Sequence, residues 1–172
     1  LAAHLVLALA LYVALLWTGL QLRHPEPETA PDRRLAGMRA WAVTTLVLVS
    51  VTILSGAFVA GTDAGFTYNT FPLMDGALVP AGYLPQPWYT SPFEDIATIQ
   101  FHHRVLAIVS LCVAIATGWR SRWIVLVQRA RRVANGLLIM VCLQVALGIS
   151  TLVLAVPVSL AAAHQAGAVL LL

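Results

Sequence analysis

Five long apolar runs alternate with polar segments along the chain. They cover residues 1–22, 42–61, 96–119, 133–156 and 158–172, and none of them contains an acidic residue. The middle three are each about 20 residues or longer, enough for a helix rising 1.5 Å per residue to cross a hydrocarbon core of ~30 Å. The first run is also long enough to span. The pattern therefore predicts an all-α fold, a polytopic transmembrane helix bundle.

Composition excludes a soluble domain. Of the 172 residues, 60% are hydrophobic and only 10% are charged, and the mean hydropathy is +0.86. A soluble domain could not bury so much apolar surface. The chain begins at Leu1 rather than at a methionine, and its last apolar run stops within "AVLLL". We therefore expect an internal segment of a longer membrane protein, with its last helix truncated.

Arginine positions set the predicted orientation in the membrane. All ten basic residues are arginine, and nine fall within 23–40 and 120–132, which the positive-inside rule places in the cytoplasm. The segment 62–95 contains four acidic residues and no arginine or lysine, so we expect it on the opposite side. Because topology explains these charges, the formal net charge of +3 does not indicate nucleic-acid binding. Four tryptophans fall at the predicted cytoplasmic helix ends, where an aromatic belt forms: Trp17, Trp41, Trp119 and Trp123.

The polar segments divide the chain into three expected parts. Residues 1–22 form one membrane helix, 23–40 a flexible cytoplasmic connector rich in Pro and Glu, and 41–172 a four-helix bundle. The outer loop 62–95 is long for a connection without regular structure, so we expect it to fold over the outer face of the bundle. Within the bundle, "ILSGAFVAGTD" faintly resembles "VALGISTLVLAV". This favours two helix pairs of the same design, one with the long outer loop and one with a very short loop at 156–158.

Two histidines lie at similar predicted depths in the membrane. If their helices begin at Ile96 and Val158, His103 lies roughly 10 Å and His164 roughly 9 Å below the outer boundary. Imidazoles at one level on different helices of a bundle suit axial ligation of a haem, since one ring nitrogen must approach the iron from each face. The alternative is that each histidine only hydrogen-bonds to a neighbouring helix.

Three further polar positions accompany this pair. His4, near the start of the first run, can share the same level. Arg104 is the only arginine outside the two cytoplasmic stretches, and a guanidinium in the membrane needs a partner, either a haem propionate or a structural acceptor. His102 is offset from His103 by about 100° around a helix, so both cannot point at one iron, and we interpret His102 as a supporting residue.

Three polar residues of the outer loop are also candidates for a site: Asp63, Asn69 and Asp75. Asp and Asn side chains readily satisfy backbone groups in turns, which favours a role in bracing the loop. Contact with a haem is the alternative.

Taken together, these motifs resemble one family. The stretch "AGTDAGFTYNTFPLMDG", followed by "FEDIATIQFHHR" and then by "LQVALGISTLVLAVPVSLAAAHQAGA", closely resembles the haem A synthases of the proteobacterial and mitochondrial type. The resemblance covers nearly all of the chain, starting with "AAHLVLALALYVALLW", which is similar to the family's fourth membrane helix. It implies an eight-helix protein made of two four-helix halves, with this chain as the carboxy-terminal part and its first helix in the amino-terminal half.

The resemblance also implies ligands and a reaction. His103 and His164 would be the axial ligands of a haem B cofactor, with Arg104 beside it, and His4 would bind the iron of the substrate, haem O. The implied reaction oxidises the C8 methyl group of haem O to a formyl group, with oxygen from water, and gives haem A for cytochrome c oxidase. The family's catalytic glutamate would lie before Leu1, so this segment alone should be inactive.

The implied setting is the bacterial inner membrane, with the loops 23–40 and 120–132 cytoplasmic and the loop 62–95 periplasmic. Haem O synthase and cytochrome c oxidase assembly factors are the implied partners, and a homo-oligomer is compatible. Two other functions stay open. A bis-histidine b-type electron-transfer cytochrome uses the same histidines but gives no reason for the long outer loop. A cofactor-free transporter or assembly factor, with the histidines joining helices, predicts a colourless protein.

Overall fold

The described chain is a bundle of long apolar helices. The computed structural model describes residues 2–23 and 33–172. Its helices are α1 (Ala2–Arg23), α2 (Arg33–Gly61), η1 (Ala64–Phe66), α3 (Ser91–Glu94), α4 (Ile96–Ser121), α5 (Gln128–Val153) and α6 (Val158–Leu170). Helices α1, α2, α4 and α5 are long and apolar enough to cross a membrane, and α6 is a shorter apolar helix. The predicted all-α, multi-pass membrane fold is confirmed.

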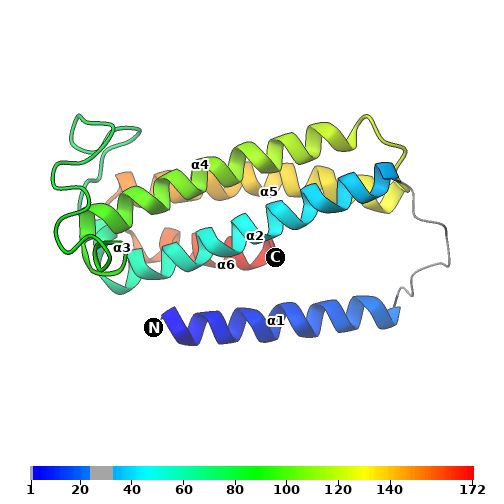
Figure 1. The fold of residues 1–172 in the computed structure, drawn as a ribbon, viewed down its shortest axis with the longest axis horizontal. Coiled ribbons are helices and arrows are strands. Elements are labelled where there is room, and N and C mark those ends of the chain that lie inside the picture. The colour runs from blue at the N-terminus through cyan, green and yellow to red at the C-terminus, as the bar shows by residue number, and fades with distance from the viewer. Residues whose placement is uncertain (1, 24–32) are drawn as a thin grey trace.

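The helices lie nearly parallel, with the long loop at one end. Helices α2, α4, α5 and α6 lie side by side, whereas α1 lies at the edge beside α2 (Figure 1). The segment 62–95 gathers at the end where α2 finishes and α4 and α6 begin. No residue in the most apolar window of α1 is buried within the described chain. The four-helix unit therefore carries most of the internal packing, and α1 contacts it mainly along α2.

Two helices begin earlier than the apolar runs indicated. Helix α2 begins at Arg33, inside the expected connector 23–40, and α5 begins at Gln128, inside the expected loop 120–132. Arginine is a good helix former, and its long side chain can extend from a helix end toward the headgroup region. A helix can therefore continue past the apolar core at the arginine-rich end, which hydropathy alone does not indicate.

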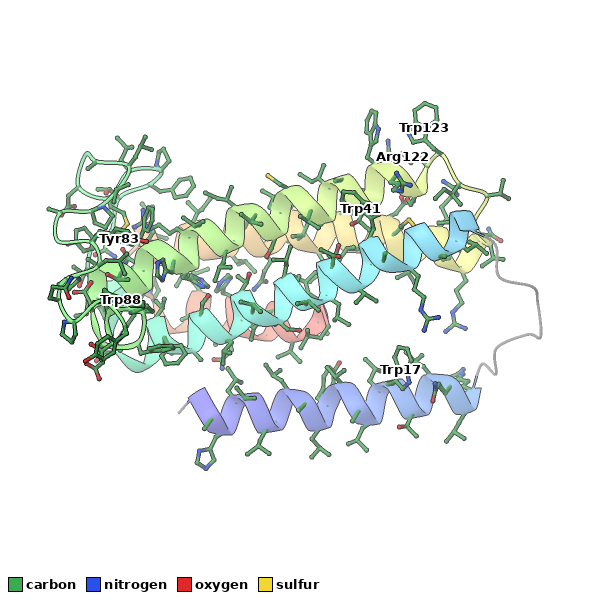
Figure 2. The ribbon with its side chains drawn as sticks, viewed as in Figure 1. Trp17, Trp41, Tyr83, Trp88, Arg122 and Trp123 are labelled. Carbon is green, nitrogen blue, oxygen red and sulfur yellow. The ribbon has the colours of Figure 1, made fainter. Side chains whose placement is uncertain are left out.

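Aromatic side chains mark both ends of the bundle. Figure 2 shows Trp17, Trp41 and Trp123 toward the end where α4 finishes, and Tyr83 and Trp88 at the opposite end, in the outer loop. These three tryptophans are exposed, as residues of an interfacial belt are. The three tryptophans thus lie toward one end of the bundle, as the sequence predicted.

Small polar residues join α2 to α4. Interhelical hydrogen bonds in membrane proteins contribute on average about 0.6 kcal/mol each, so a row of them fixes the register of two helices more than it stabilises them. The three contacts, each 2.8 Å between the polar atoms, are Thr45 with Thr117, Thr52 with Ser110, and Ser55 with His103.

The turn between α5 and α6 is very short, as predicted. The Val156 amide donates to the Thr151 carbonyl at 2.8 Å, and the Ala155 amide donates to the Leu152 carbonyl at 3.1 Å. This is the Schellman pattern, with Ala155 in the left-handed conformation (φ 57°) where glycine is usual. Pro157 is the N-cap residue of the next helix, α6. The turn sends α6 straight back along α5 from the outer end.

The outer loop folds onto the bundle, which confirms the expectation. Gln100 of α4 donates through Nε2 to the carbonyls of Ala64 at 2.8 Å and Thr67 at 2.5 Å. Asn69 of the loop donates through Nδ2 to the Leu152 carbonyl of α5 at 2.7 Å. The loop is thus hydrogen-bonded to both helix pairs.

Candidate functional site

The fold brings His103 and His164 together. Helices α4 and α6 begin at Ile96 and Val158, the two residues from which the depths of the histidines were predicted. Both helices run away from the outer end (Figure 1). The two side chains are half-buried and lie close enough to interact electrostatically. His103 therefore lies seven residues and His164 six residues from the outer start of its helix, as the sequence predicted.

A glycine of the preceding helix faces each imidazole. A Cβ atom added at Gly56 of α2 would stand 3.1 Å from His103 Cε1, and one at Gly148 of α5 would stand 2.9 Å from His164 Cε1. Only glycine allows a ring to approach a helix backbone so closely. The faint sequence repeat aligns Gly56 with Gly148, so each helix pair places its histidine against its partner helix in the same way.

The glycines also give each ring access to a backbone carbonyl. The Thr52 carbonyl, four residues before Gly56, faces the His103 ring, and the Gln144 carbonyl, four residues before Gly148, faces the His164 ring. The hydrogen bonding of the two rings differs. His103 Nδ1 lies 2.8 Å from Ser55 Oγ, whereas His164 Nδ1 is buried and satisfies no hydrogen bond with any described residue.

Gln144 fixes the backbone at His164 rather than its ring. Its Nε2 donates to the His164 carbonyl at 2.5 Å, while its Oε1 is buried without a partner in the described chain. Gly167, one turn beyond His164, leaves room for the Gln144 side chain, because a Cβ there would overlap Gln144 Oε1. Gln144 therefore forms a hydrogen bond between α5 and α6.

Arg104 holds the outer loop. Its guanidinium donates to the carbonyls of Tyr68 at 2.6 Å, Thr70 at 2.8 Å and Leu73 at 3.3 Å. It also donates to Gln100 Oε1 at 3.2 Å. Arg104 Nε is buried without a partner among the described residues. These contacts match the structural alternative for Arg104, and one donor stays available to a ligand.

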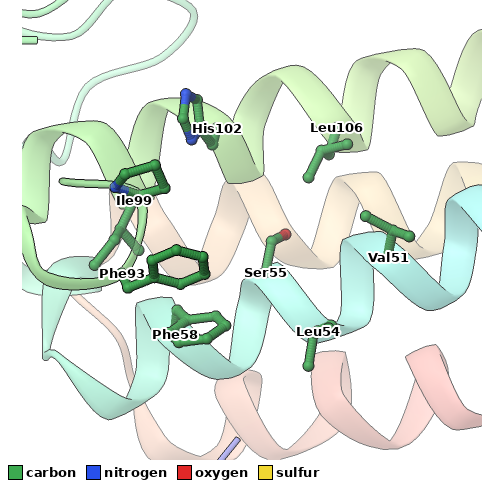
Figure 3. Close-up of a pocket in the computed structure, with 9 residues that line it drawn as sticks. Val51, Leu54, Ser55, Phe58, Phe93, Ile99, His102 and Leu106 are labelled. Atoms are coloured by element: carbon green, nitrogen blue, oxygen red, sulfur yellow. The ribbon is translucent and has the colours of Figure 1, made fainter. Parts of the chain in front are cut away.

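His102 points away from the histidine pair. Its Nε2 lies 3.0 Å from the Tyr83 hydroxyl, and its ring meets the Tyr83 ring edge to face. His102 also lines an apolar cavity of about 150 Å³ between α2 and α4, together with Ser55, Phe58 and Phe93 (Figure 3). His102 and His103 thus occupy different surroundings, as their offset around the helix predicted.

The three polar loop residues have separate contacts. Asn69 bridges Gly65 and Leu152 through its amide, which is a bracing role. Asp63 precedes η1 in the left-handed conformation without a side-chain cap. The Asp75 amide donates to Thr70 Oγ1 at 3.1 Å. The Asp75 carboxylate lies near enough to Arg104 to interact electrostatically. None of these three contacts involves His103 or His164.

His4 lies outside this arrangement. It is exposed on α1, the helix at the edge of the described bundle. The residues that sequence reasoning missed are Ser55, Gly56 and Gly148. The only available signal was the weak repeat, which aligns the two glycines.

Comparisons with known proteins agree with these motifs. The COX15-CtaA family model, described as cytochrome oxidase assembly protein, matches residues 1–172. "Heme A synthase" of Nitrosospira multiformis is 45% identical over 173 residues, covering 99% of this chain and 48% of the relative. "Heme A synthase" of Granulibacter bethesdensis is 47% identical over 175 residues, covering 100% of this chain and 44% of the relative.

A human relative, "Heme A synthase COX15" of Homo sapiens, is 44% identical over 173 residues, covering 100% of this chain and 42% of the relative. No solved structure matches. The chain thus spans about half the length of the curated relatives it matches. Because the family model matches every residue of the sequence, this chain belongs to the COX15-CtaA family of cytochrome oxidase assembly proteins.

Proposed function

We propose that the protein containing this chain is a haem A synthase, an oxidoreductase that converts the C8 methyl group of haem O to a formyl group. The family match and the relatives named "Heme A synthase" support this. Within that protein, residues 41–172 would hold a haem B, and His103 and His164 are the residues that would ligate its iron. One observation supports this assignment most. The imidazoles of His103 and His164 lie near each other in the bundle, and each is packed against a glycine.

The residues present fit a haem held in this way. A haem iron needs only two axial ligands from the protein, because the porphyrin supplies the others. Neither His103 Nε2 nor any His164 ring nitrogen makes a hydrogen bond to a described residue, so each ring has a nitrogen free to ligate. Arg104, near the outer end, retains one unpartnered donor that can meet a propionate.

The chain's own residues position and shield such a group. When bound, a haem here supplies one-electron redox chemistry. His103 and His164 would orient such a group through their imidazoles, and Gly56 and Gly148 hold the two rings in place. The outer loop, held by Arg104 and Gln100, covers the outer end of the bundle and limits the entry of water.

The substrate is assigned to the other half of the protein. Converting a methyl group to a formyl group takes up one water oxygen and releases four electrons and four protons. We place His4 at the iron of haem O and α1 in the amino-terminal half, so the reacting methyl group is not held by 41–172 alone. His4 is exposed on α1, so it is accessible to a ligand outside the four-helix unit.

We also propose the bacterial inner membrane as the location. The loops 23–40 and 120–132 then face the cytoplasm and the loop 62–95 faces the periplasm, as the distribution of arginine requires. Haem O synthase, which supplies the substrate, and cytochrome c oxidase assembly factors, which receive the product, are the proposed partners.

Pigment analysis tests the proposed reaction. The full-length protein would be expressed with a haem O synthase in a host that makes no haem A, and its bound pigments extracted. Haem A in the extract, absent from His103→Ala and His164→Ala variants, is the expected result. Haem B without haem A would instead establish the electron-transfer cytochrome, and a colourless protein under haem-replete expression would overturn both.

Gly148→Ala is expected to impair haem binding in the full-length protein. The new Cβ would stand 2.9 Å from His164 Cε1, so the ring or α6 must move away from α5. The low-spin haem absorption of the purified variant should fall by at least half. Gly136→Ala is the matched control, because Gly136 is also on α5 and nothing lies within 4 Å of an added Cβ. Equal absorption in the two variants would contradict the seating of His164 against Gly148.

A further inference from the structure

Ser55 joins His103 to the backbone of α2. Its hydroxyl donates to the Thr52 carbonyl at 2.8 Å, and its Oγ lies 2.8 Å from His103 Nδ1. A hydroxyl has one hydrogen and a carbonyl can only accept, so the hydroxyl hydrogen is directed to Thr52. The remaining lone pairs of Ser55 Oγ then face His103 Nδ1. The partner atom on the ring must therefore carry the proton.

A proton on Nδ1 leaves the other ring nitrogen of His103 free. A neutral imidazole with its proton on Nδ1 has an unprotonated Nε2, whose lone pair is available to a metal. No described residue hydrogen-bonds to Nε2.

We infer that Ser55 is a positioning residue, which holds His103 with its proton on Nδ1 and its Nε2 lone pair directed at the haem iron. This rests on the proposed function. A hydrogen bond donated by the far nitrogen of a ligating histidine fixes its orientation and raises its basicity. A more basic ligand favours the ferric over the ferrous iron, so Ser55 lowers the reduction potential of the haem.

The second histidine has no hydroxyl at the equivalent position. The sequence repeat that aligns Gly56 with Gly148 places Leu147 opposite Ser55, and a leucine has no polar atom to offer. His164 Nδ1 correspondingly satisfies no hydrogen bond within the described chain. The two axial ligands are therefore unequal, and the effect of Ser55 is exerted through His103 alone.

The surroundings of Ser55 allow a clean set of variants. Ser55 lines the cavity of about 150 Å³ between α2 and α4, so the extra methyl group of Ser55→Thr has room while the hydroxyl is kept (Figure 3). Ser55→Ala removes the hydroxyl. Ser50→Ala is the matched control, because Ser50 lies on the same helix and donates only to its own helix, at the Leu46 carbonyl.

The test is a potentiometric titration of the full-length, haem-loaded protein, with electron paramagnetic resonance of the ferric state. In Ser55→Ala, the His103 ring keeps its place against Gly56, so haem is retained. The ratio of ferric to ferrous affinity should fall by up to roughly tenfold, a rise in midpoint potential of up to about 59 mV for one electron. The ferric g-values should shift as well. Ser55→Thr and Ser50→Ala should match wild type in both measurements.

Every other outcome either supports or overturns the positioning role of Ser55. A potential and g-values in Ser55→Ala equal to those of Ser50→Ala would overturn the inference. Loss of haem in Ser55→Ala but not in Ser55→Thr would support the inference, because only Ser55→Thr keeps the hydroxyl. Loss of haem in both would assign Ser55 to packing and overturn it. A wild-type protein without haem would instead overturn the proposed function on which the inference rests.

Discussion

Replacing either His103 or His164 with alanine is expected to abolish the low-spin b-type signal of the carboxy-terminal haem in the full-length protein. Each variant removes one of the two imidazoles that the bundle places at one level. With a single axial histidine, the haem iron becomes high-spin or the haem is lost from the protein. The second ligand comes from another helix, so it cannot be replaced locally. Reduced-minus-oxidised spectra, with extraction and quantification of haem B, measure the loss.

The control for this experiment is the neighbouring histidine. His102→Ala changes the same helix by the same truncation, but its ring is directed to Tyr83 rather than to His164. This variant should retain the low-spin signal and the haem B content of wild type. A normal signal in His103→Ala, or its loss in His102→Ala alone, would show that the ligand has been assigned to the wrong residue.

Arg104→Ala is expected to release the outer loop. The variant removes the donors of three loop carbonyls and of Gln100 Oε1. Hydrogen bonds to charged groups contribute about 1.5–3 kcal/mol each, and partial replacement by water reduces the sum. We therefore expect about 2–4 kcal/mol less free energy holding the loop on the bundle. Amide hydrogen exchange in 62–95 should accelerate correspondingly, while exchange in the centres of α4 and α5 stays slow.

A control variant, Arg39→Ala, and a second measurement, haem B content, separate the possible effects of Arg104→Ala. Arg39→Ala, which truncates an exposed arginine of α2, should leave exchange in the loop unchanged. Haem B content separates the two roles weighed for Arg104. Faster exchange with haem retained assigns Arg104 to the loop, whereas haem loss with unchanged exchange assigns it to a propionate. Unchanged exchange and unchanged haem content together would contradict both roles.

The helices and the depth of the histidines could be predicted from the sequence. A membrane span needs a minimum apolar length, and the helical rise is fixed, so the starts at Ile96 and Val158 determine where His103 and His164 lie. The helix starts at Arg33 and Gln128 could not be predicted in this way, because a helix can continue into the interface once arginine replaces apolar residues.

The residues that support the histidines could not be predicted. Ser55 contacts a residue 48 positions away, and a serine in an apolar helix ordinarily bonds only to its own helix, as Ser50 does. The acceptors of Arg104 are backbone carbonyls of an irregular loop, and any residue type can supply a carbonyl. Such contacts depend on how segments meet in space, which no local pattern of the sequence specifies.

A cryo-electron microscopy map of the full-length protein, purified with its haem, tests the central claim most directly. The claim predicts one macrocycle within the unit formed by α2, α4, α5 and α6, with density continuous from its iron to the Nε2 atom of His103 on one face and to the His164 ring on the other. A haem held through His102, or one whose iron contacts only one of the two rings, would contradict it.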